Sequence, residues 1–390
     1  MEKIRLRKTI LLTIIILLGI SFYEFSFVDS FSRFLILSSF TVIVLISFFG
    51  ERHHLPKQFS FPLIFYFFGI FLSVIACKLY WDQSILQSFL ALKSFYLMFF
   101  YFTLHVIRPT IKEIHRVVIL ISIGYVICYS ISLITYPDIL FGSKAISRRN
   151  TISINIFGVI FLVYSIFLTF YKSFIEKKRM YLFLFLIFLT FIFIRASRNA
   201  IFAILFLLIY FYYLRNRFSL LKFFQILLIV FAFIFSFGLY QNYFDTLVNI
   251  TMSQFFEGNT YIRIQSLLYY LFEHSQNNVN LFFGNGIFNA DSNYGKYVVN
   301  SLWKNKGFYA EDIGLIGFWS YFGVITLFSY IYMIFLMLKK HNSMPIRYFS
   351  LYLIIMSFAT MDSYMTDSLI FQPLVFYMSD ILLYRSKSII

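Results

Sequence analysis

Residues 240–312 read YQNYFDTLVNITMSQFFEGNTYIRIQSLLYYLFEHSQNNVNLFFGNGIFNADSNYGKYVVNSLWKNKGFYAED, the one long polar segment in a chain that is otherwise a succession of apolar runs. The segment carries acids and bases, among them Arg263, Glu311 and Asp312. Apolar runs of the length of membrane helices flank it on both sides. It therefore predicts a large loop outside a lipid bilayer, inserted between two groups of transmembrane helices.

The composition supports membrane integration. Of the 390 residues, 60% are hydrophobic and only 13% are charged, and the mean hydropathy is +0.80. A soluble domain carries about 25% charged residues and could not keep this much apolar surface away from water.

The apolar runs predict an all-α polytopic fold. A hydrocarbon core of about 30 Å takes roughly 20 apolar residues per helix, which predicts about twelve transmembrane helices. The predicted spans are 9–23, 31–49, 61–79, 87–107, 117–135, 152–171, 181–196, 200–214, 223–240, 312–338, 348–364 and 368–384. No small-residue cleavage site follows Ile20, so the first span is expected to stay uncleaved. The chain then divides into a first group of spans over 1–239, one large extracytoplasmic loop over 240–311 and a last group of spans over 312–390.

The positions of the positive charges indicate the orientation. The net charge is +16, and most of the 33 lysines and arginines fall in alternate short linkers such as 3–8, 172–179 and 215–222. Cytoplasmic loops carry this bias, so we expect both termini in the cytoplasm. The same distribution argues against a nucleic-acid partner. Cys77 and Cys128 lie far apart, in or beside predicted helices, so neither a disulfide nor a cysteine metal site is expected.

Several cations break this bias, because the predicted topology places them outside or in the outer part of the membrane. They are Arg148 and Arg149 in the third outside loop, Arg195 and Arg198 in the fourth, Arg263 in the large loop and Lys93 in the fourth span. A charge within a span is costly and marks a buried partner or a pathway. Because a guanidinium matches the geometry of phosphate oxygens, such residues together could bind a diphosphate without a metal or another cofactor. Snorkelling to lipid headgroups is the alternative, and it is the interpretation we favour for Arg33.

Three motifs follow one another between residues 180 and 340. They are Arg195-Ala196-Ser197-Arg198-Asn199 between two predicted helices, Arg263 with Gly284-Asn285-Gly286 in the large loop, and Glu311-Asp312-Ile313-Gly314 with Tyr321-Phe322-Gly323 at its exit. This order resembles the O-antigen polymerase and O-antigen ligase superfamily. The resemblance implies a GT-C-like membrane fold and a location in the bacterial cytoplasmic (inner) membrane.

The loop exit distinguishes the two activities of that superfamily. The ligase pattern has a His-Asn pair there, whereas this chain has Asp312, and His274 lies well upstream. The resemblance therefore favours the polymerase, which joins undecaprenyl-diphosphate-linked oligosaccharide repeat units into O-antigen or capsular polysaccharide. The ligase, which transfers glycan to lipid A core, is the alternative within enzymes. Besides the lipid-linked glycan and the bilayer, a polysaccharide chain-length regulator is a candidate partner.

The implied reaction assigns roles to the motif residues. A sugar hydroxyl of one repeat unit attacks the anomeric carbon of a glycan carried on another undecaprenyl diphosphate, and the diphosphate leaves. Arg198 and Arg263 would stabilise the charge that develops on the leaving group. Asp312, or Glu311 beside it, would accept the proton of the attacking hydroxyl.

Other interpretations stay open. The two adjacent acids would also suit a helix start, where the dipole favours negative charge. A flippase for the same lipid-linked units is the alternative from another class of protein, although the single large loop and the lack of a visible repeat argue against it. Glu24 and Asp29 lie where metal-dependent lipid-sugar transferases place an acid. No strand is predicted before Gly284-Asn285-Gly286, so we expect a tight turn there and not a nucleotide site. Residues 261–272 predict a helix along the membrane interface.

Overall fold

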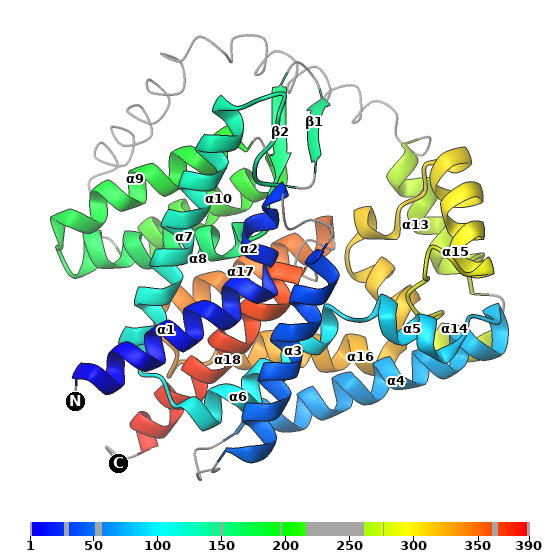
Figure 1. The fold of residues 1–390 in the computed structure, drawn as a ribbon, viewed down its shortest axis with the longest axis horizontal. Coiled ribbons are helices and arrows are strands. Elements are labelled where there is room, and N and C mark those ends of the chain that lie inside the picture. Colours follow the sequence, from blue (N-terminus) through cyan, green and yellow to red (C-terminus); the bar gives the residue numbers. More distant parts are fainter. Residues whose placement is uncertain are drawn as a thin grey trace. The chain divides into compact units, whose positions relative to one another are not determined.

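The structure is a computed structural model, and it describes residues 2–26, 31–50, 57–142, 144–148, 151–195, 197–215, 261–275, 277–360 and 366–387. The chain forms two compact units, which are described separately. The first consists of residues 1–51 and 102–253, and the second of residues 52–101 and 254–390. Almost all of the described secondary structure is helical (Figure 1).

The first unit is built from apolar helices around α7 and α8. Its elements are α1 (Glu2–Gly19), α2 (Ser21–Glu24), α3 (Ser32–Phe49), α7 (Ile111–Ile134), α8 (Val159–Phe170), the π-helix η3 (Tyr171–Ile175), α9 (Arg179–Ile194) and α10 (Arg198–Arg215). Helix α7 begins with a capping box, in which Thr110 Oγ1 accepts from the Glu113 N–H and Glu113 Oε2 accepts from the Thr110 N–H. Helices α7 and α8 meet through the 2.7 Å hydrogen bond between the buried Ser122 and Ser165 hydroxyls.

A β-hairpin departs from the all-α expectation. Strands β1 (Lys144–Arg148) and β2 (Thr151–Asn155) pair antiparallel, with Ile146 opposite Ser153 and Arg148 opposite Thr151. Strand β1 lies in the predicted third outside loop, whereas β2 covers the first residues of the helix predicted over 152–171, so that prediction was wrong at its start. Two short adjacent segments can pair their backbone groups with each other, which a loop outside lipid permits.

The second unit contains the loop exit and the last helices. Its elements are α4 (Ser60–Trp81), α5 (Ile85–Ala91), the 3-10 helix η2 (Phe95–Phe99), the start of α6 (Phe100–Ile107), α13 (Ile262–Phe272), α14 (Asn278–Phe283), α15 (Asn293–Tyr297), the π-helix η5 (Val298–Lys306), the 3-10 helix η6 (Ala310–Ile313), α16 (Leu315–Met337), α17 (Met344–Ala359) and α18 (Thr366–Lys387). Helices α4 and α16 form the main packing interface of this unit. They approach closely at Gly69, where a Cβ would lie 2.9 Å from the Thr326 backbone nitrogen.

The described helices follow the predicted spans except in two places. In the span predicted over 152–171, strand β2 comes first and α8 begins only at Val159. The predicted boundary between the seventh and eighth spans is confirmed, because α9 ends at Ile194 and α10 begins at Arg198. The single helix predicted over 87–107 is instead broken: Ile85–Ala91 and Phe95–Ile107 are bent by 67°. The predicted span 223–240 lies outside the described residues.

The lengths and apolar character of the helices are compatible with an all-α membrane protein. Within the described ranges, α4, α7 and α16 are long and apolar enough to cross a membrane, and the bent pair would add a fourth such segment. Several shorter apolar helices accompany them. The total of about twelve spans stays a prediction.

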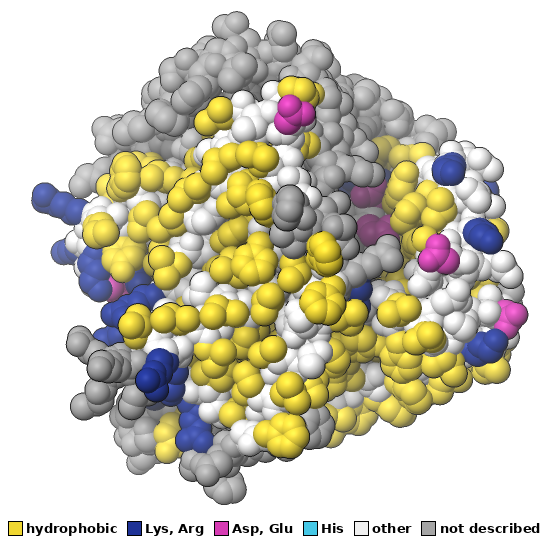
Figure 2. Space-filling view, in the orientation of Figure 1, with side chains coloured by type: hydrophobic (Ala, Val, Ile, Leu, Met, Phe, Trp, Pro, Cys, Tyr) yellow, Lys and Arg dark blue, Asp and Glu magenta, His cyan; other side chains and the backbone are white. Residues whose placement is uncertain are grey.

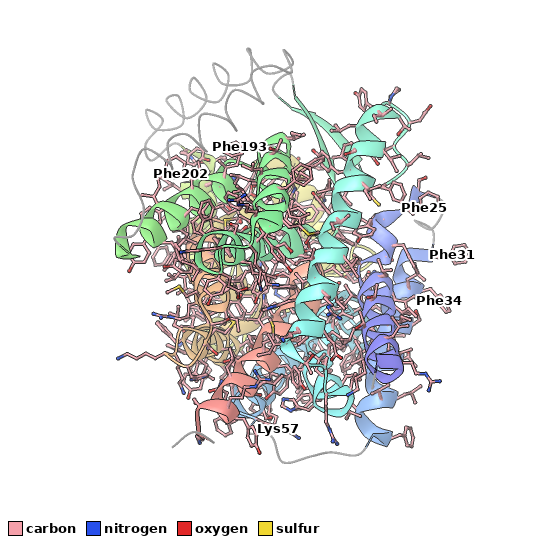
Figure 3. All side chains as sticks on the ribbon, turned by 90° about the vertical axis from the view of Figure 1, so that its left-hand side faces the viewer. Phe25, Phe31, Phe34, Lys57, Phe193 and Phe202 are labelled. Carbon is pink, nitrogen blue, oxygen red and sulfur yellow. The ribbon has the colours of Figure 1, made fainter. Side chains whose placement is uncertain are left out.

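Large apolar side chains cover the outside of these helices. Figure 2 shows a band of hydrophobic side chains along α4, to which Phe61, Phe68 and Leu79 contribute with exposed fractions of 67%, 50% and 69%. In Figure 3 the rings of Phe31 and Phe34 point away from the helices that carry them. Such surfaces would be costly in water and are suited to lipid.

Candidate functional site

The two acids of the loop exit lie in η6, between the large polar segment and α16. Asp312 faces outward and forms an ion pair with Arg263, with 3.8 Å between Asp312 Oδ1 and the nearer guanidinium nitrogen. Both side chains remain accessible, at 47% and 37% exposure. Arg263 lies in the first turn of α13, so the ion pair connects the start of that helix with the end of the loop.

Glu311 has a different environment, although it is the neighbour of Asp312. The Tyr321 hydroxyl donates a 3.3 Å hydrogen bond to Glu311 Oε1. Glu311 Oε2 is inaccessible to solvent and has no hydrogen-bond partner. Burial raises the pKa of Glu311 above its ordinary value, and the negative charge of Asp312 acts in the same direction, while the hydrogen bond from Tyr321 lowers it.

Buried tyrosines surround the Glu311 carboxyl. Tyr321 and Tyr270 come from α16 and α13, and both are almost completely buried, at 3% and 1% exposure. The Tyr270 hydroxyl has no hydrogen-bond partner. Burial, and after it the charge of Glu311, raise the pKa of Tyr270. The Glu311 carboxyl group and two phenol groups thus lie close together, next in sequence to the accessible Arg263–Asp312 pair.

A second buried group lies on the other side of Tyr270. A 3.1 Å hydrogen bond joins His274 Nε2 and the Tyr294 hydroxyl, and the imidazole tautomer decides which of the two is the donor. The imidazole ring also contacts the Tyr270 ring edge to face, with 4.8 Å between the ring centroids. Trp81 of α4 stacks on Tyr294 at 4.4 Å and on His274 at 5.6 Å. Burial lowers the pKa of His274 to about 4, so the imidazole is neutral at physiological pH.

The Gly284-Asn285-Gly286 motif packs directly against the Tyr321-Phe322-Gly323 motif. The Gly286 N–H donates to the Tyr321 carbonyl at 2.8 Å. Gly284 and Gly323 both have positive φ, +86° and +73°. A Cβ on Gly284 would lie 2.6 Å from the Gly323 nitrogen, and one on Gly323 would lie 2.5 Å from the Phe283 carbonyl carbon. The glycines allow two backbones to touch, so this motif has a packing role next to Tyr321.

Asn285, between those glycines, holds the surrounding segments together. Its Oδ1 accepts from Trp81 Nε1 at 3.0 Å and from Asn280 Nδ2 at 2.7 Å. Its Nδ2 donates to the Ser320 carbonyl at 3.1 Å. The end of α4, α14 and the start of α16 are therefore joined by one buried amide.

An aromatic surface adjoins the acid pair. The Tyr309 ring is 40% exposed and stacks on Trp303 at 5.4 Å, and Trp303 contacts Phe288 edge to face at 5.1 Å. The Asp312 N–H donates to the Tyr309 carbonyl at 3.2 Å. A supported, flat and partly exposed ring is thus positioned within one turn of the ion pair.

The other predicted site residues are distributed over both units. Lys93 is half-buried and lies in the break between α5 and η2, not in a continuous span. Arg195 follows the last residue of α9, in the first unit. Arg198 begins α10 and Arg148 ends β1, but their side chains lie outside the described part, as does all of Arg149. The structure joins two of the predicted site residues, Arg263 and Asp312, in an ion pair. A shared site of Arg198 with Arg263 stays a prediction.

The sequence prediction did not include Tyr270, Tyr321, His274 or Asn285 as site residues. In α13 the structure buries Tyr269 and Tyr270 and exposes Leu268 and Phe272, at 46% and 74%. All four side chains are large and apolar or aromatic, so the residue types alone do not reveal which of them turn inward. Within the described ranges no group of three or more His, Cys, Asp or Glu residues is placed to hold a metal ion.

Comparisons with protein-family models, with curated proteins and with solved structures give no match to this chain. The geometry of η6, α13 and α16 is therefore the basis of the functional conclusion.

Proposed function

We propose that this protein polymerises undecaprenyl-diphosphate-linked oligosaccharide repeat units at the outer face of a bacterial cytoplasmic membrane. The proposal includes a GT-C-like fold of about twelve transmembrane helices, with both termini in the cytoplasm. The product is O-antigen or capsular polysaccharide. The order of the three sequence motifs supports this choice of substrate.

The observation that carries the proposal is the accessible Arg263–Asp312 pair next to Glu311, whose Oε2 is buried. Glycosyl transfer from a diphosphate needs a cation beside the leaving oxygen and a group that accepts the proton of the attacking hydroxyl. The loop exit offers both within η6 and the first turn of α13. At 3.8 Å the contact with Asp312 is longer than a hydrogen bond, so the N–H donors of Arg263 remain available to phosphate oxygens.

Reconstitution tests the proposal directly. The purified protein in liposomes with undecaprenyl-diphosphate repeat units should yield a ladder of glycan lengths. Arg263→Ala should lower the rate by about 10²–10³, because it removes one electrostatic donor. Lys304→Ala is the matched control, since it removes an exposed cation of the same segment and should leave the ladder unchanged.

The stability of the variant separates chemistry from folding. An exposed ion pair contributes at most about 1 kcal/mol, so Arg263→Ala should melt close to the unmodified protein. An undiminished ladder from Arg263→Ala would refute the site. Transfer to lipid A core in place of another repeat unit would indicate the ligase, and movement of the units across the bilayer without bond formation would indicate a flippase.

A further inference from the structure

We infer that Glu311 is the proton-accepting catalytic residue, that Tyr321 is its positioning residue, and that Asp312 serves to orient Arg263. This division of roles rests on the proposed function and deepens it. From the sequence, Asp312 is the first candidate for the base and Glu311 beside it is the second. Their contacts distinguish them.

The contacts of Asp312 make it the less suitable base. Its carboxylate is directed at the guanidinium of Arg263, and nearly half of its side chain is in contact with solvent. An attacking hydroxyl would have to compete with water and with Arg263 for this carboxylate. The same contact gives it another use, because it limits the orientations of the side chain that is proposed to meet the diphosphate.

The contacts of Glu311 suit a base. One carboxyl oxygen accepts the hydrogen bond from Tyr321, which fixes the plane of the carboxyl group. The other oxygen, Oε2, is buried and lacks a partner. A buried acceptor without a hydrogen bond is costly, and it is uncommon unless a ligand or a water satisfies it. The hydroxyl of an acceptor sugar would supply the missing donor.

Tyr270 provides a second unmatched group at the same place. Its hydroxyl is buried without a partner, and its pKa responds to the charge of Glu311. Tyr270 comes from α13, the helix that also carries Arg263, and Tyr321 comes from α16. The titratable groups facing Glu311 are therefore Tyr321 from α16, Tyr270 from α13 and Asp312 from η6 itself, while α17 meets the following turn through the Ser357 backbone.

The acceptor hydroxyl transfers its proton to Glu311, and its oxygen forms a bond with the anomeric carbon of the donor glycan. The bond between that carbon and the diphosphate oxygen breaks, and undecaprenyl diphosphate leaves with the electron pair beside Arg263. The protonated Glu311 then returns its proton to water. Because burial raises the pKa of Glu311, the carboxylate is a better proton acceptor than a solvated one.

The test compares Glu311→Gln, Asp312→Asn and Tyr321→Phe with the unmodified protein, reconstituted with undecaprenyl-diphosphate repeat units. We expect Glu311→Gln to lower kcat by about 10²–10⁴ with little change in KM, which is the usual loss for a general base. Asp312→Asn should mainly raise KM, because Arg263 loses its orientation. Tyr321→Phe removes a hydrogen bond that lowers the pKa of Glu311, so the acidic limb of the kcat/KM profile should move to higher pH. Glu311→Asp keeps a carboxyl group, so it should retain part of the activity that Glu311→Gln loses.

Thermal melting shows whether the variants are folded. Since an amide cannot ionise in the buried position, Glu311→Gln should be at least as stable as the unmodified protein at neutral pH. Full kcat in Glu311→Gln, or loss of kcat at constant KM in Asp312→Asn, would overturn the assignment while the polymerase function stands. An unmodified protein that forms no glycosidic bond with these substrates would instead overturn the proposed function, and the assignment with it.

Discussion

Gly323→Ala tests whether the two glycine motifs form one structural unit beside the candidate site. Gly323 has φ +73° and ψ −176°, a conformation that is essentially restricted to glycine and costs other residues about 1–3 kcal/mol. The added Cβ would also lie 2.5 Å from the Phe283 carbonyl carbon and 2.7 Å from the Phe283 Cα, where ordinary carbon contacts are about 3.5–4.0 Å. These are backbone atoms, so no side-chain rotation relieves the overlap, and overpacking of this kind adds about 1–3 kcal/mol.

The total of about 2–6 kcal/mol should displace the segment 282–286 from α16. Gly307→Ala is the matched control, since Gly307 also has positive φ, +68°, but its Cβ would meet only the flexible end of the Ile262 side chain. That variant should lose about 1–2 kcal/mol from the backbone conformation alone.

Cys77 reports the displacement locally. It is completely buried, and its Cβ would lie 2.7 Å from a Cβ on Gly286. In a Cys128→Ala background, maleimide should label Cys77 faster in Gly323→Ala than in Gly307→Ala, and the first variant should melt at the lower temperature in detergent. Equal melting of the two variants, with Cys77 equally protected in both, would refute the close contact between the motifs.

Three further predictions concern the same unit. Burial lowers the pKa of His274 from 6.5 to about 4, so the unfolded state takes up a proton at a higher pH than the folded state does, and the free energy of unfolding should fall by about 3 kcal/mol as the pH drops from 6.5 to 4. Thermal melts of His274→Gln across that pH range should show a smaller dependence. An unchanged profile would contradict the burial of a neutral imidazole. Asn285→Ala leaves Trp81 and Asn280 without their shared acceptor, so it should cost about 2–6 kcal/mol in a melting experiment, whereas a neutral effect would argue against that hydrogen-bonded centre. Tyr309→Ala should raise the KM for the lipid-linked substrate several-fold, because a sugar ring loses its flat apolar contact. Tyr309→Phe keeps the aromatic ring and should retain the KM of the unmodified protein. Equal effects of the two substitutions on the KM would exclude stacking.

Hydropathy predicts where most of the described helices lie, because a helix in lipid needs a continuous apolar run. It also separates α9 from α10, since Arg195 and Arg198 interrupt the run between them. It misses the break at Lys93. A window of about 20 residues averages over the short interruption between Ala91 and Phe95, and so it merges α5, which begins at the capping box of Ser84 and Gln87, with the helix that follows.

The hairpin and the buried tyrosines were missed for different reasons. In β2, Ile152 and Ile154 alternate with polar residues, which is a strand signal that a search for apolar runs does not detect. Tyr270 and Tyr321 are separated along the chain by the whole of the loop exit, and only the packing of α13 against α16 brings them to one carboxyl group. No periodicity within one segment encodes such a contact.

The adjacent acids show why residue type and spacing are not sufficient to assign a catalytic role. A 3-10 helix has about three residues per turn, so neighbouring side chains on η6 point about 120° apart. One of them consequently meets Arg263 at the surface, and the other meets Tyr321 in the interior. Neighbouring side chains would also point in different directions in an α-helix or a strand. Which of the two acids turns inward depends on how η6 is rotated relative to α13 and α16. That rotation is set by the Gly314 turn, whose φ of +57° brings its backbone against the Ser357 carbonyl. The chemistry proposed for Glu311 therefore depends on a glycine that makes no contact with the substrate.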